Sequence, residues 1–304
     1  MPQTAIVLVH LGDSLPAYLN DCIAQLALHT SMPVHVVVPT ALAQGVAAPA
    51  MALAVETLGA GAKRAAFEQG TTLDKGFRGG FWKFASERFF VLEQAMEALG
   101  LDELIHLEND VLLYTDPARL LPALRAHYTI ASTFDNDSRC IPGFVYVRSR
   151  SAMAELTTLL LLCKGANDMM ALAALRNARP ALLDNLPIIP NFWSHPLRST
   201  NGQTTRDPSR YSRHFEDFGG VWDAAALGQY VGGVDPHNRD GDTRGFINEA
   251  CLFQPSQLQV EWRKDARGMH CPWLGHGGRQ YPAFSLHIHC KDLARYRSDS
   301  STVS

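Results

Sequence analysis

Short apolar runs alternate along this chain with stretches of helical periodicity. Residues 5–10 form an apolar, β-branched run, residues 16–28 carry apolar positions at helical spacing, and residues 34–38 form a second β-branched run. Continuous apolar runs are typical of buried strands, whereas a spacing of three or four residues is typical of a helix. A strand, a helix and a strand joined by short links indicate parallel pairing. The opening of the chain therefore predicts an α/β fold.

The same alternation continues through most of the chain. Further strands are predicted at 104–107, 111–114, 128–133 and 143–147, and further helices at 81–99, 118–125, 151–162, 169–175 and 224–230. No internal repeat or linker divides the sequence. We expect one domain over residues 1–297, built on a mixed, mainly parallel sheet flanked by helices. The polar residues 298–304 are expected to form a disordered tail.

Two acidic residues stand between two of these apolar runs. Glu108 and Asp110 follow the run 104–107 and precede the run 111–114. An unpaired carboxylate is costly in apolar surroundings, and a strand end that opens into a cleft or a bound cation removes that cost. Magnesium or manganese commonly takes one or two carboxylates together with substrate phosphates. The alternative is a tight turn, with Asn109 in an unusual backbone conformation.

The run Glu108-Asn109-Asp110 after an apolar strand resembles the DxD-type metal motif of GT-A glycosyltransferases, with Glu in place of the first Asp. The resemblance implies a GT-A-type, Rossmann-like fold, a nucleotide-sugar donor, first of all a UDP-sugar, and Mn²⁺ or Mg²⁺ as cofactor. It gives Asp110 a metal-binding role. Glu108 would bind the cation through water or contact the ribose, and Asn109 would lie in the donor site between them.

The same resemblance suggests further donor-binding residues. The end of the first strand lies near the nucleotide base in GT-A enzymes, which makes Leu11 and Gly12 candidates, with a plain turn as the alternative. Lys83 and Arg88, on the helix predicted at 81–99, would face the donor. For Lys83 the alternative is a solvated ion pair with Glu87, four residues further along the helix.

A second polar stretch lies near the C-terminus. Strand alternation places His287 and His289 on one face, and Lys291 follows. GT-A enzymes commonly complete the metal shell with a C-terminal His, and a following Lys can meet the diphosphate. Either histidine could be the ligand. The alternative is a zinc site, although the spacings match no standard zinc pattern; its residues would be His270, Cys271, His276, His287, His289 and Cys290.

Two acidic residues are candidates for a catalytic base. An inverting glycosyltransferase needs a carboxylate that acts on the acceptor, and Asp168 and Glu249 are both available. Asn167-Asp168 resembles the acceptor-side Asn-Asp turn of several retaining GT-A enzymes, with Met169 where Gln usually follows. The alternative for this pair is a helix N-cap. The stereochemical outcome stays open.

The composition of the chain limits the classes of binding partner and the cellular setting that can be expected. The chain has 304 residues and a formal net charge of −3, with 46% hydrophobic and 19% charged residues. This is ordinary globular composition, and the lack of a basic surplus argues against nucleic-acid binding. The six cysteines form no CxxC pair, which favours a reducing, cytoplasmic setting over a disulfide framework. The longest apolar stretch, 156–163, is too short to span a bilayer, so only peripheral membrane contact is left open.

These observations favour a metal-dependent glycosyltransferase of the hexosyltransferase type. It would move a sugar from a small-molecule nucleotide-sugar to a glycan, lipid-linked or other hydroxyl acceptor. One alternative is a nucleotide-sugar binding protein without activity. Another is a metal-dependent phosphatase of the haloacid dehalogenase type, but its nucleophile is an Asp at the first acidic position, where this chain has Glu108.

Overall fold

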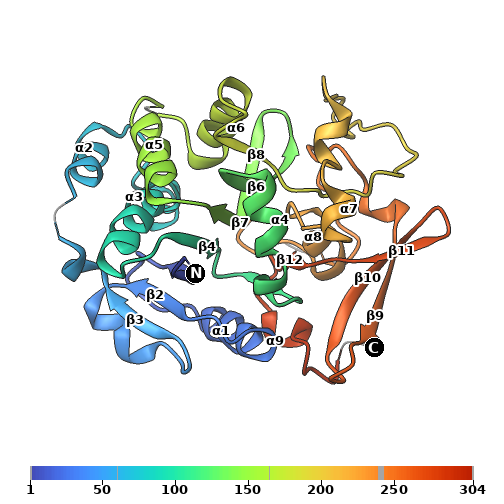
Figure 1. Ribbon diagram of the computed structural model, residues 1–304, viewed down its shortest axis with the longest axis horizontal. Coiled ribbons are helices and arrows are strands. Elements are labelled where there is room, and N and C mark those ends of the chain that lie inside the picture. Colours follow the sequence, from blue (N-terminus) through green and yellow to red (C-terminus); the bar gives the residue numbers. More distant parts are fainter. Residues whose placement is uncertain (1, 60, 164, 239–242, 303–304) are drawn as a thin grey trace.

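The computed structural model describes residues 2–59, 61–163, 165–238 and 243–302, and within these a seven-stranded sheet forms the centre of the molecule (Figure 1). The strand order is β3-β2-β1-β4-β7-β6-β8. The bounds are β1 Thr4–Val9, β2 Val34–Val38, β3 Met51–Ala54, β4 Glu103–Leu107, β6 Ile130–Asn136, β7 Arg139–Val147 and β8 Leu183–Asn185.

Most neighbouring strands of this sheet run parallel. Strands β3, β2, β1 and β4 are parallel to one another, and so are β6 and β8. Strand β7 is antiparallel to both of its neighbours, β4 and β6. The five residues of β4 are all buried, as expected of a strand in the middle of a sheet covered on both faces. The predicted α/β fold with a mixed, mainly parallel sheet is confirmed.

Helices flank this sheet, and the longest of them, α3, packs against β1 and against α2, α5 and α6. The helices predicted from apolar periodicity are present, some with shifted ends. The α-helices are α1 Ala17–His29, α2 Ala62–Gly70, α3 Phe81–Ala98, α4 Leu121–His127, α5 Arg150–Leu160, α6 Asp168–Ala178, α7 Phe215–Phe218, α8 Ala226–Gly232 and α9 Leu293–Tyr296. Short 3-10 helices are η1 Thr40–Gly45, η2 Val55–Leu58, η3 Phe77–Gly79, η4 Pro117–Arg119, η5 Pro208–Tyr211 and η6 Pro255–Gln257.

Two smaller sheets lie beside the large one. Strand β5 (Val111–Leu113) pairs antiparallel with β12 (Ser285–His287), far along the chain. Strands β9 (Gln259–Lys264), β10 (His270–His276) and β11 (Arg279–Pro282) form an antiparallel sheet at the right of Figure 1. The β5–β12 pair matters most for function, because it places C-terminal residues against the segment that carries Glu108 and Asp110.

Ser298 is the first residue of the segment expected to form a disordered tail. This residue is fully buried, and its backbone N–H donates to Gln25 Oε1 on α1 (2.9 Å). Its hydroxyl lies 2.8 Å from Nε2 of His29. These buried hydrogen bonds fix the chain beyond Arg297, and residues 303–304 lie outside the described residues. Among the helices that the structure describes, none combines the length and the apolar character needed to cross a membrane.

Candidate active site

The two acidic residues lie where the sheet changes its direction of winding. From β1 the chain builds β2 and β3 on one side, and it then returns to place β4 on the other side of β1. Asn109, between the two acids, donates its side-chain N–H to the carbonyl of Val9 at the end of β1 (3.2 Å). Open α/β sheets bind ligands at such a switch point, outside the carboxyl ends of the strands. The fold therefore places Glu108 and Asp110 in the position expected of a binding site.

Strand β12 delivers a histidine to these acids. His287 pairs in register with Val111, and the N–H of Ile288 donates to the carbonyl of Asp110 (2.9 Å). Nε2 of His287 lies 3.0 Å from Oδ1 of Asp110 and 3.4 Å from Oε2 of Glu108. One ligand atom from each of the three residues lies within 4.8 Å of the others. The group combines two carboxylates and one imidazole.

The two histidines of this stretch are not equivalent. His287 contacts both acidic side chains, whereas His289 accepts a hydrogen bond at Nδ1 from the Gln229 side chain (3.3 Å). Their ring centroids are 4.3 Å apart. Burial and the nearby charge of His287 hold the pKa of His289 well below its usual value, so its ring is neutral. Of the two sequence candidates, His287 is the one that the fold groups with the acids.

Two permanent cations also reach the acids. Lys291 pairs with Oδ2 of Asp110 and lies over the Tyr18 ring, 5.2 Å from its centroid. Arg88, buried on α3, pairs with Glu108 and donates to Oδ2 of Asp168 (2.8 Å). The predicted residues Glu108, Asp110, Asp168, Arg88, Lys291 and His287 thus form one connected cluster, called the acidic site below.

The carboxylates of the acidic site have different electrostatic surroundings. Burial alone would raise the pKa of Asp110, but His287 and Lys291 outweigh it and hold this pKa well below its usual value. At Asp168, burial and the nearby Glu108 outweigh the attraction of Arg88 and raise the pKa to about 6. Asp110 is therefore a permanent anion, while Asp168 titrates close to neutrality.

The donor set of the acidic site fits a hard or borderline divalent cation. Its three carboxylates face two permanent cations and His287, whose pKa burial alone would lower but Asp110 and Glu108 raise. A surplus of negative charge arises when His287 gives up its proton, as it must to bind a cation. Nδ1 of His287 and Oδ1 of Asp168 are buried without a hydrogen-bond partner among the described residues. Carboxylate oxygens with one imidazole suit manganese or magnesium. Glu108, Asp110 and His287 are the residues that would hold the ion.

Other sequence candidates lie outside this cluster. Lys83 pairs with Glu87 (2.5 Å), as in the ion-pair alternative, but the Glu87 side chain is buried, so the pair is not a solvated one. Glu249 has an exposed side chain. Among the described residues, no hydrogen bond or ion pair joins Lys83 or Glu249 to Glu108, Asp110 or His287.

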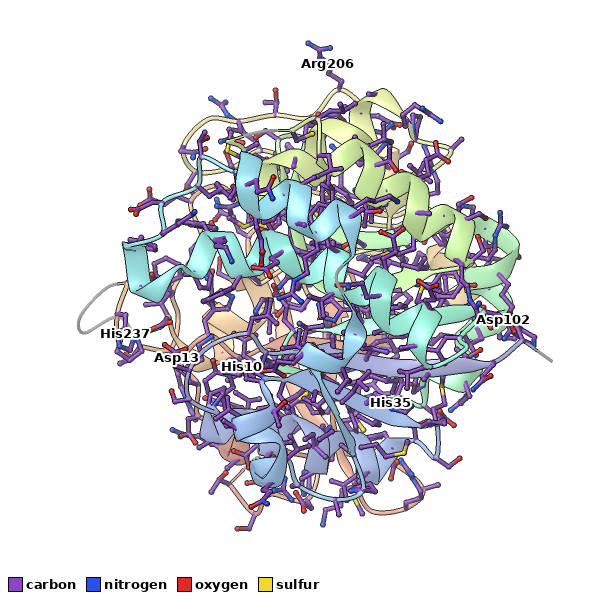
Figure 2. The ribbon with its side chains drawn as sticks, turned by 90° about the vertical axis from the view of Figure 1, so that its left-hand side faces the viewer. His10, Asp13, His35, Asp102, Arg206 and His237 are labelled. Carbon is purple, nitrogen blue, oxygen red and sulfur yellow. The ribbon has the colours of Figure 1, made fainter. Side chains whose placement is uncertain are left out.

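The remaining donor candidates, Leu11 and Gly12, follow the end of β1. That strand end is tied to Asn109, so both residues belong to the connection that leaves the switch point. Figure 2 labels His10 and Asp13 of this connection. Their predicted contact with a nucleotide base stays a prediction.

Two supporting residues were not found from the sequence. Asp223 is buried and accepts hydrogen bonds from the backbone N–H groups of His287 (2.9 Å), Leu227 (2.9 Å) and Gly228 (2.8 Å). A Cβ at Gly228 would lie 2.0 Å from the carbonyl oxygen of His287, so only glycine fits there. Asp223 and Gly228 together fix the backbone of His287. A single sequence carries no signal for such long-range contacts.

Fold and site together define an α/β protein with a cluster of acidic and basic side chains and one histidine at the switch point of its sheet. No family model and no curated protein matches the chain. Among solved structures, the apo form of mouse xyloside xylosyltransferase 1 aligns at 12% identity and a TM-score of 0.43, covering 60% of this chain and 84% of that chain.

A cytidylyltransferase from Leptospira borgpetersenii serovar Hardjo-bovis aligns at 9% identity and a TM-score of 0.38, covering 62% of this chain and 76% of that chain. Likenesses as distant as these two carry no argument about activity. The function must be inferred from the residues of the acidic site.

Proposed function

We propose that this protein is a metal-dependent glycosyltransferase that moves a sugar from a nucleotide-sugar, first of all a UDP-sugar, to a hydroxyl acceptor. The observation that carries the proposal is the convergence of Glu108, Asp110 and His287 at the switch point of the sheet. The resemblance of Glu108-Asn109-Asp110 to the GT-A metal motif points the same way. Transfer of a sugar requires stabilisation of the negative charge that develops on the leaving diphosphate.

The bound cation supplies much of this stabilisation by neutralising the diphosphate. Lys291 is the residue best placed to add a second positive charge, because its ammonium group already lies against Asp110. We assign it to a phosphate oxygen of the donor. Removal of the Lys291 side chain should therefore weaken binding of the nucleotide diphosphate.

The contacts of Arg88 support a role other than the direct donor contact expected from its place on α3. Its guanidinium is buried and already engaged by Glu108 and Asp168. We propose that Arg88 positions Glu108 beside the cation, and that Asp168 holds the Arg88 guanidinium in place. Because Asp168 is occupied in this way, the proposal does not use it as the acceptor base, and the stereochemistry of transfer stays open.

The proposal is tested by incubating the protein with a panel of nucleotide-sugars and Mn²⁺ and measuring the nucleotide released. Water accepts the sugar where no acceptor is added. We expect release from a UDP-sugar, loss of release in EDTA, and loss of release in Asp110→Asn. The matched control is Asp299→Asn, which removes an exposed carboxylate paired with Arg297.

Each alternative function gives a different result in this experiment. Metal-dependent UDP binding without release from any donor would identify a binding protein and overturn the proposed activity. Phosphate release from a simple phosphoester would identify a phosphatase. Equal UDP affinity with Mn²⁺ and with EDTA would remove the cation from the site.

A further inference from the structure

A second cluster of metal-binding side chains lies apart from the acidic site. His127 is the last residue of α4, His214 immediately precedes α7, and Asp217 lies within α7. Figure 1 shows these two helices next to each other. Oδ2 of Asp217 is 3.0 Å from Nε2 of His127 and 3.5 Å from Nδ1 of His214. One ligand atom from each residue lies within 4.8 Å of the others.

We propose that His127, His214 and Asp217 form a surface site for zinc. Two imidazole nitrogens and one carboxylate oxygen are a donor set that zinc accepts, with water in the fourth position. Calcium and magnesium prefer sites made of oxygen atoms, so they fit this cluster less well. The donor set also differs from that of the acidic site, which has one imidazole and carboxylates.

The spacing of the donor atoms agrees with zinc geometry. Bonds of about 2.0–2.2 Å place the ligand atoms of a tetrahedral zinc ion about 3.3–3.5 Å apart. The two distances from the Asp217 carboxylate, 3.0 and 3.5 Å, lie close to this value. The distances from the Asp217 carboxylate to the two imidazole nitrogens therefore need little change for the site to close around an ion.

The main adjustment concerns the two imidazole rings. They are stacked, with centroids 3.8 Å apart and an interplanar angle of 14°. Each ring must tilt to direct its nitrogen lone pair at a shared ion. Both side chains are 27% exposed, which leaves room for this rotation.

Two further features favour a cation here. Among the described residues, Asp217 has no ion pair with Lys or Arg. Its carboxylate instead pairs with the imidazoles of His127 and His214. His214 holds a left-handed backbone conformation (φ 61°), which is unfavourable for a residue other than glycine. A metal bond at His214 would offset this cost.

The position of the site suggests a structural effect. Zinc would connect the end of α4 to the segment that leads from α7 to Asp223, the residue that holds the His287 backbone. The ion would support the acidic site without contacting its substrate.

Calorimetric titration with Zn²⁺ tests the proposal, in the metal-free Asp110→Asn protein so that binding at the acidic site does not interfere. We expect one equivalent of zinc, a higher melting temperature with zinc, and visible Co²⁺ absorption of tetrahedral character. His127→Gln and Asp217→Asn, each in this background, should weaken zinc binding at least roughly 10-fold. The matched control is His195→Gln, which removes an exposed imidazole elsewhere on the surface.

Two results would overturn the zinc site. One is the absence of zinc binding in the Asp110→Asn protein. The other is unchanged zinc affinity in both His127→Gln and Asp217→Asn. His127 and Asp217 lie at the surface, with side chains 27% and 51% exposed, so these variants should fold, and their melting temperatures without zinc check this.

Discussion

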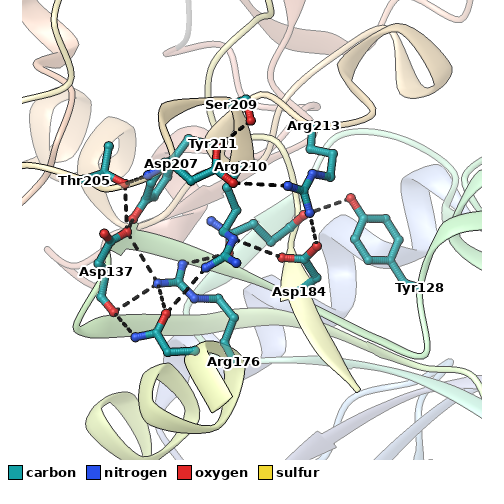
Figure 3. A network of polar contacts seen from close by, with 12 residues as sticks. Tyr128, Asp137, Arg176, Asp184, Thr205, Asp207, Ser209, Arg210, Tyr211 and Arg213 are labelled. Carbon is teal, nitrogen blue, oxygen red and sulfur yellow. Dashed lines mark hydrogen bonds and ion pairs between the residues drawn. The ribbon is translucent and has the colours of Figure 1, made fainter. Parts of the chain in front are cut away.

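Two groups of charged side chains in this protein both combine carboxylates with cations. They differ in the number of permanent cations for each carboxylate. The first is the acidic site. The second, called the Arg–Asp network here, is drawn in Figure 3 and consists of Asp137, Asp184, Asp207, Arg176, Arg210 and Arg213. The network has one arginine for each carboxylate. In the acidic site three carboxylates share two permanent cations.

Hydrogen bonding shows the same difference. The carboxylate of Asp137 accepts from the hydroxyls of Tyr211 (2.6 Å) and Thr205 (3.0 Å) and from the N–H of Arg206 (3.1 Å). Burial opposes these bonds, but they hold the pKa of Asp137 below its usual value. At Asp168 in the acidic site, the pKa is instead raised to about 6. A balanced group of charges holds segments of the chain together, whereas the acidic site has fewer permanent cations than carboxylates, as the proposed cation site requires.

The largest expected effect comes from the charge surplus itself. Asp110→Asn keeps the shape of the side chain and removes the charge that would hold the cation, so kcat/KM should fall roughly 100-fold or more. The metal-free protein should melt at a slightly lower temperature, because Lys291 loses its partner. Nucleotide release and thermal melting measure the two effects. A folded variant with near wild-type turnover would contradict the assignment of Asp110.

The support of His287 gives the next effect. Gly228→Ala places a methyl group where only 2.0 Å separates it from the His287 carbonyl oxygen. We expect a loss of roughly 2–3 kcal/mol in unfolding free energy, the scale of overpacking, and weaker Mn²⁺ binding as β12 shifts. The matched control is Gly232→Ala in the same helix, where the new Cβ would meet the flexible Cys290 side chain at 3.2 Å. Equal effects of both variants would show that the contact with His287 is not special.

A substitution in the Arg–Asp network should change the stability of the protein but not its activity. Asp137→Asn removes the charge that faces the buried Arg176 and weakens several hydrogen bonds, so the unfolding free energy should fall by roughly 2 kcal/mol. The kcat/KM of the folded fraction should not change. Chemical denaturation and nucleotide release test the two statements separately. A change in kcat/KM of the folded protein would contradict the conclusion that the Arg–Asp network acts on stability alone.

The last expected effect is a pH dependence of stability with opposite sign in the two groups. Between its unfolded pKa near 4 and its folded pKa of about 6, Asp168 binds more protons in the folded state than in the unfolded state. Its contribution to stability is therefore present below pH 4 and is lost as pH rises through 6. Asp137, with a lowered pKa, contributes stability above pH 4 that is lost as pH falls.

Denaturation of the wild-type protein, Asp168→Asn and Asp137→Asn from about pH 2.5 to pH 7 measures these contributions. The stability of wild type relative to Asp168→Asn should fall by up to about 1 kcal/mol per pH unit between pH 4 and 6. The stability of wild type relative to Asp137→Asn should instead rise as pH increases from the acid end of the range. A stability difference between wild type and Asp168→Asn that does not change with pH would show that Asp168 is ionised throughout.

The sequence predicted the parts of this site that depend on local pattern. The apolar run before Glu108 defines β4, and alternation around His287 indicates a strand, so both halves of the site could be found. The pairing of β5 with β12 could not, because it joins segments far apart in the chain. The choice between His287 and His289 depends on that register.

Partners of charged residues were equally hard to predict. Lys83 and Arg88 lie on the same helix. Lys83 pairs with Glu87 within that helix, whereas Arg88 pairs with Glu108, and this second contact depends on tertiary packing. The β9–β11 sheet was not predicted either. Most residues of β9 are only partly buried or exposed, so the strand has no continuous apolar run. Apolar periodicity depends on burial, and no residue of β9 is buried.

The pairing of β5 with β12 also sets an order of events during synthesis. Because β12 is made long after β5, the edge of β5 stays unpaired while the intervening chain emerges, and unpaired strand edges invite association with other chains. Until then Asp110 has neither His287 nor Lys291 beside it. A nascent chain that stops before residue 285 would carry the two acids without their imidazole ligand, so cation binding would mark the chains that have been completed through β12.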